Sequence, residues 1–112
     1  MENLEQQAFS LIVHSGDGRS YAFEAIRASK EKDFEKAEEL LKLSSKEFEQ
    51  AHHVQTELLT MEADGNSSIL SLLLIHAQDH LMTGITVKQL AEELIEIRRE
   101  INMDKEKNKN IQ

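Results

Sequence analysis

The chain has no proline in 112 residues, and this absence constrains its fold more than any other single feature. A proline inside a helix costs about 3 kcal/mol, because it removes a backbone hydrogen bond and clashes with the preceding turn. Residues that favour turns or strands are also scarce, with four glycines, four phenylalanines, one tyrosine and no tryptophan. The sequence therefore predicts an all-α fold built from long helices.

The first helix is expected over about residues 4–29. Apolar residues recur there at steps of three and four: Leu4, Ala8, Leu11, Ile12, Ala22, Phe23 and Ile26. Gly16 and Gly18 interrupt this pattern, and each costs a helix about 1 kcal/mol relative to alanine. They mark either a local bend or a close approach of another backbone, and close packing is the preferred interpretation.

A second helix is expected to follow the polar turn Lys30–Lys32. Asp33 is a suitable N-cap, because its carboxylate can accept an unpaired backbone N–H at the helix start. A pattern typical of helical bundles follows: Phe34, Ala37, Leu41, Ser44, Phe48, Ala51, Gln55 and Leu58. Gly65 can then take a left-handed conformation and Ser67 can cap the next helix, so the second helix is expected to end near Ala63.

The third helix is expected from about Ser68 to Ile101. Apolar residues surround its first part from Ile69 to Ile75, so either this helix lies centrally or subunits associate around it. Its second half carries one apolar seam: Val87, Leu90, Leu94, Ile97 and Ile101. Residues 104–112 are rich in Lys and Asn and offer no packing face, which predicts one domain over residues 1–103 and a disordered tail over 104–112.

Charge and composition exclude several classes of function. The formal net charge is −8, from 21 acidic residues against 13 Lys and Arg, and such a surface repels nucleic acid and anionic membranes. The apolar stretch Ile69–Ile75 is far shorter than the roughly 20 residues of a membrane-spanning helix. The first residues lack a secretory signal, and zero cysteines exclude thiolate chemistry. A cytoplasmic protein without membrane insertion and without a nucleic-acid partner is expected.

One polar cluster follows the most apolar segment directly. His76, Asp79, His80 and Thr83 lie at spacings of three, four and seven, so they share one side of a helix, while Gln78 points elsewhere. Such a cluster must find partners inside the protein, at a subunit interface or at a functional surface. The spacing alone leaves three interpretations open: structural hydrogen bonding, a metal ion shared by His76, His80 and Asp79, or a nucleophilic histidine.

The nucleophilic interpretation concerns phosphoryl transfer. A neutral imidazole is available at ordinary pH and can attack phosphorus, and Gln78, His80 or Thr83 can donate hydrogen bonds to the phosphoryl oxygens. No glycine-rich nucleotide loop is present, so the donor is expected to be another phosphoprotein. The other histidines, His14, His52 and His53, fit ordinary packing or surface positions.

Three segments together resemble the lactose/cellobiose-type enzyme IIA of the bacterial phosphoenolpyruvate-dependent sugar phosphotransferase system (PTS). The longest is His76-Ala77-Gln78-Asp79-His80-Leu81-Met82-Thr83, and the others are Ala51-His52-His53-Val54-Gln55-Thr56-Glu57-Leu58 and Asp33-Phe34-Glu35-Lys36-Ala37. The resemblance extends over about residues 5–101. Gly84 departs from it, because a small residue of higher helix propensity is expected there, and this glycine is expected to loosen the helix.

The resemblance implies an antiparallel three-helix bundle (up-down-up) that assembles as a homotrimer. It implies that His76 accepts a phosphoryl group from the phosphocarrier HPr and passes it to a cysteine of enzyme IIB. Gln78 and His80 then become phosphate-binding helpers. Asp79 from three subunits is implied to hold one divalent cation, Mg²⁺, on the threefold axis.

Two other classes compete with a phosphoryl carrier. The same helix can serve a non-catalytic trimeric interaction module, and a metal hydrolase would need an open coordination position beside His76 and His80. The transported sugar, whether of the lactose, cellobiose or chitobiose type, is not encoded in this chain, because an enzyme IIA handles only the phosphoryl group.

Overall fold

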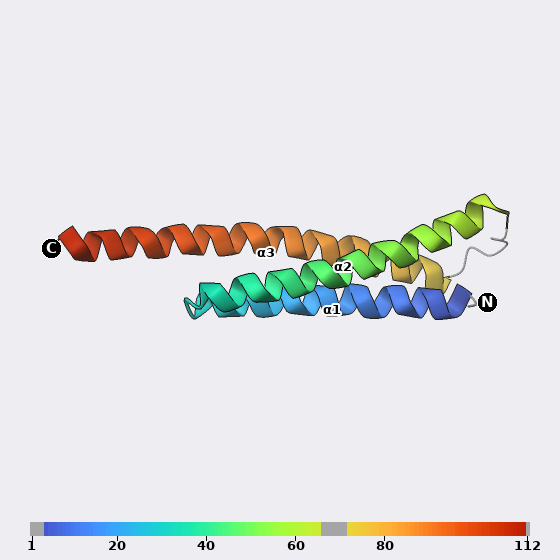
Figure 1. Ribbon diagram of the computed structural model, residues 1–112, viewed down its shortest axis with the longest axis horizontal. Coiled ribbons are helices and arrows are strands. Elements are labelled where there is room, and N and C mark those ends of the chain that lie inside the picture. Colours follow the sequence, from blue (N-terminus) through green and yellow to red (C-terminus); the bar gives the residue numbers. More distant parts are fainter. Residues whose placement is uncertain (1–3, 66–71, 112) are drawn as a thin grey trace.

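The computed structural model describes residues 4–65 and 72–111, which form three α-helices: α1 (Leu4–Lys30), α2 (Phe34–Ala63) and α3 (Leu72–Ile111). The helices alternate in direction along a body of 69 × 19 × 17 Å (Figure 1). α2 and α3 both pack mainly on α1 and make few contacts with each other. The predicted all-α, antiparallel three-helix bundle is confirmed.

The predicted turn between α1 and α2 is confirmed, although it begins at Glu31, because Lys30 is still the last residue of α1. The Asp33 carboxylate accepts a hydrogen bond from the backbone N–H of Lys36 at 3.1 Å, which makes Asp33 the N-cap of α2. Lys32 adopts the left-handed conformation that closes helix C-termini, with φ of 64°. Gly65 also takes a positive φ, of 79°, just after α2. The predicted cap Ser67 and the apolar residues Ile69 and Leu70 lie outside the described residues.

The predicted end of the third helix near Ile101 was wrong. α3 continues to Ile111, and residues 104–111, which were expected to be disordered, are helical. No proline or glycine follows Gly84, and the Lys and Glu residues of this segment favour helix even where every side chain from 103 to 109 is exposed. As a result, α3 runs past the α1–α2 turn and extends beyond the rest of the bundle (Figure 1).

The Phe48 side chain of α2 fills a space that two glycines on the other helices leave open. A Cβ atom on Gly18 of α1 would lie 2.7 Å from the Phe48 ring, and one on Gly84 of α3 would lie 2.9 Å from it. The Cβ on Gly84 would also lie 3.3 Å from the carbonyl oxygen of Ser15. Close packing is therefore confirmed for Gly18. Gly84, expected to loosen α3, instead lets α3 approach the ring and α1.

Two glycines of α1 provide a matched pair of substitutions with opposite expected effects on the free energy of unfolding. Gly16→Ala should stabilise the protein by about 1 kcal/mol, because a Cβ there meets nothing within 4 Å and alanine is the better helix former. Gly18→Ala should destabilise it by about 1–2 kcal/mol, because displacing the buried Phe48 ring outweighs the same gain in helix propensity. Chemical denaturation followed by circular dichroism measures both. Equal shifts for the two variants would contradict this packing.

Of the apolar seam expected on the second half of α3, Val87 packs against the bundle core, whereas the other four residues are exposed. The chain's own core instead takes residues one position later on α3, Ala91 and Ile95, which are 0% and 1% exposed. The large side chains of the seam remain on the surface, with Leu90, Ile97 and Ile101 at least half exposed. The small Ala91 permits a close approach to α1 that a leucine would prevent. The seam is thus left available for contacts outside the single chain.

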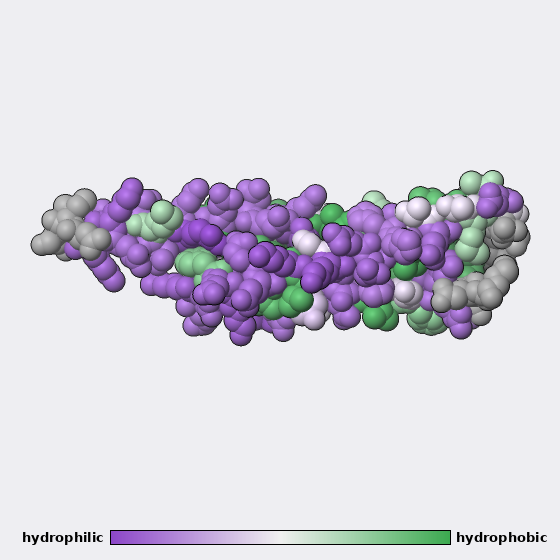
Figure 2. Space-filling view, in the orientation of Figure 1, coloured by the Kyte–Doolittle hydropathy of each residue, from purple (hydrophilic) through white to green (hydrophobic). Residues whose placement is uncertain are grey.

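The surface has two different ends. On the face shown in Figure 2, hydrophilic side chains dominate the end with the α1–α2 turn and the α3 extension, whereas apolar side chains reach the surface more often toward the other end. Within residues 4–65 and 72–111, none of the helices has an apolar run long enough to span a lipid bilayer.

Candidate functional site

Two histidines lie together on the second turn of α3. The Nε2 atoms of His76 and His80 are 3.1 Å apart, and the two rings meet edge to face with centroids 4.5 Å apart. His76 is exposed and His80 is half-buried. The neighbouring residues Ala77 and Leu81 are 0% and 1% exposed and fix this part of α3 to the core. The pair therefore stands on a rigid helix with one imidazole open to a partner.

The 3.1 Å contact fits a hydrogen bond between the two rings, and its direction depends on their tautomers. When both rings are neutral, one Nε2 carries a hydrogen and donates it to the lone pair of the other. If His80 is the donor, His76 keeps its proton on Nδ1 and presents Nε2 as a nucleophilic lone pair. The same N–H of His80 can turn to an oxygen of any group that becomes bonded to His76. Of the predicted site residues, His76 and His80 are the two whose side chains the structure brings into direct contact with each other.

Gln78 is held on a different side of α3. Its Oε1 atom accepts a hydrogen bond from Nε2 of Gln55 on α2, at 2.9 Å. Residues two positions apart in a helix are separated by about 200° around its axis. Gln78 and His76 of one chain therefore point in different directions. Gln55 is a functional candidate that the sequence reasoning did not single out. Its place in the segment Ala51–Leu58, one of the three that carry the resemblance, was the available signal.

Asp79 and Thr83 lie on the exposed surface of α3. The Thr83 hydroxyl donates to the backbone carbonyl of Asp79 at 2.7 Å, so its hydrogen is already used within the helix. The Asp79 side chain takes part in no ion pair or hydrogen bond that involves the described residues. Its carboxylate is thus available to an ion or to another chain, whereas Thr83 is a weaker candidate for binding phosphate.

No group of three His, Cys, Asp or Glu side chains is arranged to hold a metal ion within the described part of one chain. Asp79 is three positions from His76, but it does not join the two histidines in such a group. The single carboxylate of Asp79 would need further ligands from other copies to bind a divalent cation tightly.

The remaining histidines have local partners or surface positions. His14 of α1 lies 2.7 Å from a carboxylate oxygen of Glu47 on α2 and joins these two helices. His53 pairs with Glu57 one turn further along α2 at 3.3 Å, and both side chains are exposed. His52 is exposed. None of these three shows the paired, helix-anchored arrangement of His76 and His80.

Comparison with known proteins gives matches over most of the chain. The lichenan-specific phosphotransferase enzyme IIA component of Bacillus subtilis is 48% identical over 100 residues, covering 89% of this chain and 91% of that protein. The crystal structure of the PTS cellobiose-specific enzyme IIA from Bacillus anthracis superposes with a TM-score of 0.86 at 42% identity and covers 92% of this chain and 95% of that one.

A third similar structure includes a second protein. The solution structures of the IIA(Chitobiose)-HPr complex from Escherichia coli contain a chain that matches with a TM-score of 0.80 at 37% identity, over 91% of this chain and 99% of that one. Residues 6–99 match the family described as PTS system, Lactose/Cellobiose specific IIA subunit. This range contains α2, most of α1 and α3, and the His76–His80 pair. The chain therefore belongs to the lactose/cellobiose-specific enzyme IIA family of the sugar phosphotransferase system.

Proposed function

We propose that this protein is a cytoplasmic phosphoryl carrier, in which His76 accepts a phosphoryl group from HPr and passes it to a cysteine of enzyme IIB. The observation that carries the proposal is the exposed His76 imidazole, held in hydrogen-bonding contact with His80 on a rigid stretch of α3. Family membership supports the same role, since a chain of the same fold has been solved in complex with HPr.

The proposed transfer exchanges one P–N bond for another. The lone pair on Nε2 of His76 attacks the phosphorus of the donor phosphohistidine, and the electron pair of the broken P–N bond returns to the donor imidazole. The His76 ring keeps its proton on Nδ1 during attack. His80 turns its N–H from His76 to a phosphoryl oxygen and stabilises the charge of the three equatorial oxygens. A thiolate of enzyme IIB then attacks phosphorus and releases His76.

Gln78 is proposed as the second phosphate-binding helper. Because it points away from His76 of its own chain and is fixed by Gln55, it would serve the His76 phosphoryl group of a neighbouring copy. This assignment makes the complete site depend on assembly. Gln55 acts in it as a positioning residue and does not touch phosphate.

The exposed stripe along α3 supports a homotrimer around this helix. Leu72, Ile75, Asp79, Met82 and Thr86 follow one another at alternating steps of three and four residues, the spacing of helices that pack side by side. Leu72 and Met82 are 83% and 64% exposed in the single chain. Side chains of this size and exposure gain most from burial against other copies. The stripe continues into the exposed Leu90 and Ile97.

Asp79 is the residue proposed to bind the divalent cation, Mg²⁺, on the threefold axis. It is the one charged member of the α3 stripe from Leu72 to Thr86, so three copies around this stripe would bring three carboxylates to the same level. Three carboxylates brought together in this way repel one another unless a cation offsets their charge. Carboxylate oxygens are the ligands that Mg²⁺ prefers, so the residue type fits the proposed ion.

Replacement of Asp79 separates metal binding from assembly. Asp79→Leu should remove the bound ion while keeping the trimer, because an apolar trio can replace three ion-bridged carboxylates. Elemental analysis of the dialysed protein should fall from one magnesium per trimer to none, and light scattering should still give three chains. Asp17→Leu, an exposed aspartate of α1, is the control and should leave both unchanged. Undiminished magnesium in Asp79→Leu would reject the metal assignment.

The carrier and the non-catalytic interaction module differ in one reaction. Incubation with phosphoenolpyruvate, enzyme I and HPr should add one acid-labile phosphate to each chain if the protein is a carrier. An interaction module built on the same helix would take up none. The transported sugar is proposed to be a β-linked disaccharide, as the names of the similar proteins suggest, and phosphate transfer to different enzyme IIB proteins would identify which.

A further inference from the structure

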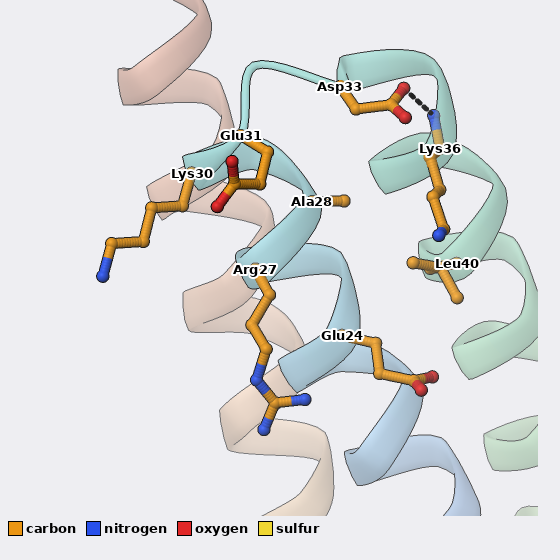
Figure 3. Close-up of a pocket in the computed structure, with 8 residues that line it drawn as sticks. All are labelled: Glu24, Arg27, Ala28, Lys30, Glu31, Asp33, Lys36 and Leu40. Carbon is orange, nitrogen blue, oxygen red and sulfur yellow. Dashed lines mark hydrogen bonds between the residues drawn. The ribbon is translucent and has the colours of Figure 1, made fainter.

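Two hollows flank the α1–α2 turn, far from the histidine pair. The larger, of about 670 Å³, is lined by residues of α1 and α2 with balanced charge: Glu24, Arg27, Lys30, Glu31, Asp33 and Lys36 surround Ala28 and Leu40. Figure 3 shows the Asp33 carboxylate directed at the backbone nitrogen of Lys36, and the Lys30 side chain pointing away from both. Its three cations and three carboxylates balance, so the lining favours neither an anionic nor a cationic ligand. This hollow therefore indicates no class of ligand.

The smaller hollow has a different character. It has a volume of about 160 Å³ and lies where α3 passes the turn. Its lining contains four cations and no carboxylate: Ser29, Lys30, Lys32, Phe34, Arg98, Ile101, Asn102 and Lys105. In a chain with 21 acidic residues and only 13 Lys and Arg, four cations around one small space are a marked local concentration. We call this site the cationic hollow.

The helical extension of α3 builds one wall of the cationic hollow. Arg98, Asn102 and Lys105 are spaced by four and three residues and therefore share a side of the helix. Lys105 belongs to the segment that was expected to be disordered, and it lines the site only because α3 continues. Asp104 and Glu106, its neighbours in the sequence, are about 100° away around the axis. The part of α3 that extends beyond α1 and α2 therefore contributes to this site.

Contacts within the described part of the chain leave most of these charged groups available to a ligand. Within residues 4–65 and 72–111, no ion pair or hydrogen bond engages the ammonium groups of Lys30, Lys32 or Lys105. A lysine near the end of α1 favours the helix dipole, which accounts for Lys30 but not for Lys105 on another helix. Arg98 uses Nη1 to bind the Ile26 carbonyl, at 2.9 Å, and the Ser29 hydroxyl, at 3.0 Å. These two bonds fix the guanidinium in the wall and leave Nη2 and Nε for a ligand.

We propose that the cationic hollow binds a dianionic phosphate group, either free or carried by a small phosphate ester. A fixed guanidinium with three mobile ammonium groups suits a compact oxyanion with several acceptor oxygens. Phe34 and Ile101 add apolar surface, against which the organic part of an ester can lie. The distance from His76 is large, since 22 residues of helix correspond to about 33 Å. This site goes beyond the phosphoryl-carrier proposal and does not depend on it.

The test is a titration of the full ¹⁵N-labelled chain followed by backbone amide shifts. Inorganic phosphate and glucose 6-phosphate are added separately, each against sodium chloride of matched ionic strength. Saturable shifts are expected at Ser29, Lys32 and Asn102. Equal affinity for the two probes would show that the site recognises the phosphate group alone. Tighter binding of the ester would show that its organic part also contacts Phe34 and Ile101. Both results support the proposal.

Matched variants decide whether the lysines carry the binding. Lys30→Ala and Lys105→Ala should each weaken phosphate binding about three- to tenfold, and the double change to glutamate should abolish it. Lys46→Ala, an exposed lysine of α2 outside the hollow, should have no effect. Alanine keeps helix propensity at Lys105, so circular dichroism should be unchanged. Shifts that chloride reproduces, shifts confined to residues 76–83, or no saturable shifts with either probe would overturn the proposal.

Discussion

His76→Ala is expected to abolish phosphoryl acceptance in the presence of phosphoenolpyruvate, enzyme I and HPr. The rate of phosphate incorporation should fall by more than about 1000-fold, because the substitution removes the atom that forms the new P–N bond. The His76 side chain is exposed, so the free energy of unfolding should change by no more than about 0.5 kcal/mol. Quenched-flow labelling together with thermal unfolding measures both quantities on the same protein.

His80→Ala is the comparison that tests the role of the pair. It should slow labelling by about 10- to 100-fold and still allow one phosphate per chain at long times, because it removes one donor to the phosphoryl oxygens and not the nucleophile. His53→Ala, which breaks only an exposed contact with Glu57, should label like the wild type. A His76→Ala protein that still takes up phosphate, or a His80→Ala protein that takes up none, would contradict the division of roles.

Phe48→Ala should produce the largest loss of stability of any single substitution considered. The ring is 4% exposed and lies where Gly18 of α1 and Gly84 of α3 both leave room for it. Alanine would open a cavity between three helices that rigid backbones cannot close, at a cost of about 3–5 kcal/mol. The melting temperature should drop by more than about 12 °C for a domain of this size.

Phe23→Ala is the matched control for that loss. Phe23 is 39% exposed and contacts the Arg19 guanidinium, which lies 5.6 Å from the ring centre. Its removal should cost about 1 kcal/mol or less. Thermal unfolding of the two variants under the same conditions gives the comparison. Similar losses of stability for both variants would contradict the role of Phe48 as the side chain that packs the three helices together.

The sequence predicted the features that depend on local chemistry. The absence of proline and the three- and four-residue periodicity indicated a helical bundle, and Asp33 was recognised as a cap because capping depends on one side chain and the next few backbone groups. The spacing of His76 and His80 similarly places them on one helix face whatever the tertiary structure. Their resemblance to a known family then selected one of three chemical interpretations.

Features that depend on contacts between helices were not predictable in the same way. Gly84 looked like a weak point of α3, yet it accommodates Phe48, which lies 36 positions earlier in the chain. The bond from Gln55 to Gln78 joins two helices and leaves no trace in local periodicity. Most of the predicted apolar seam on α3 stays exposed, because the core takes Ala91 and Ile95, one position later, together with Val87 from the seam. The end of α3 is a further such feature, because residues 104–111 stay helical although the side chains from 103 to 109 are exposed.

The most direct test of the central claim is to locate the phosphate on the chain. The protein is phosphorylated through enzyme I and HPr, kept at neutral to alkaline pH so that the P–N bond survives, and fragmented for tandem mass spectrometry. The account predicts a single phosphate on His76. Phosphate on His14, His52, His53 or His80 instead, or on no histidine at all, would contradict it.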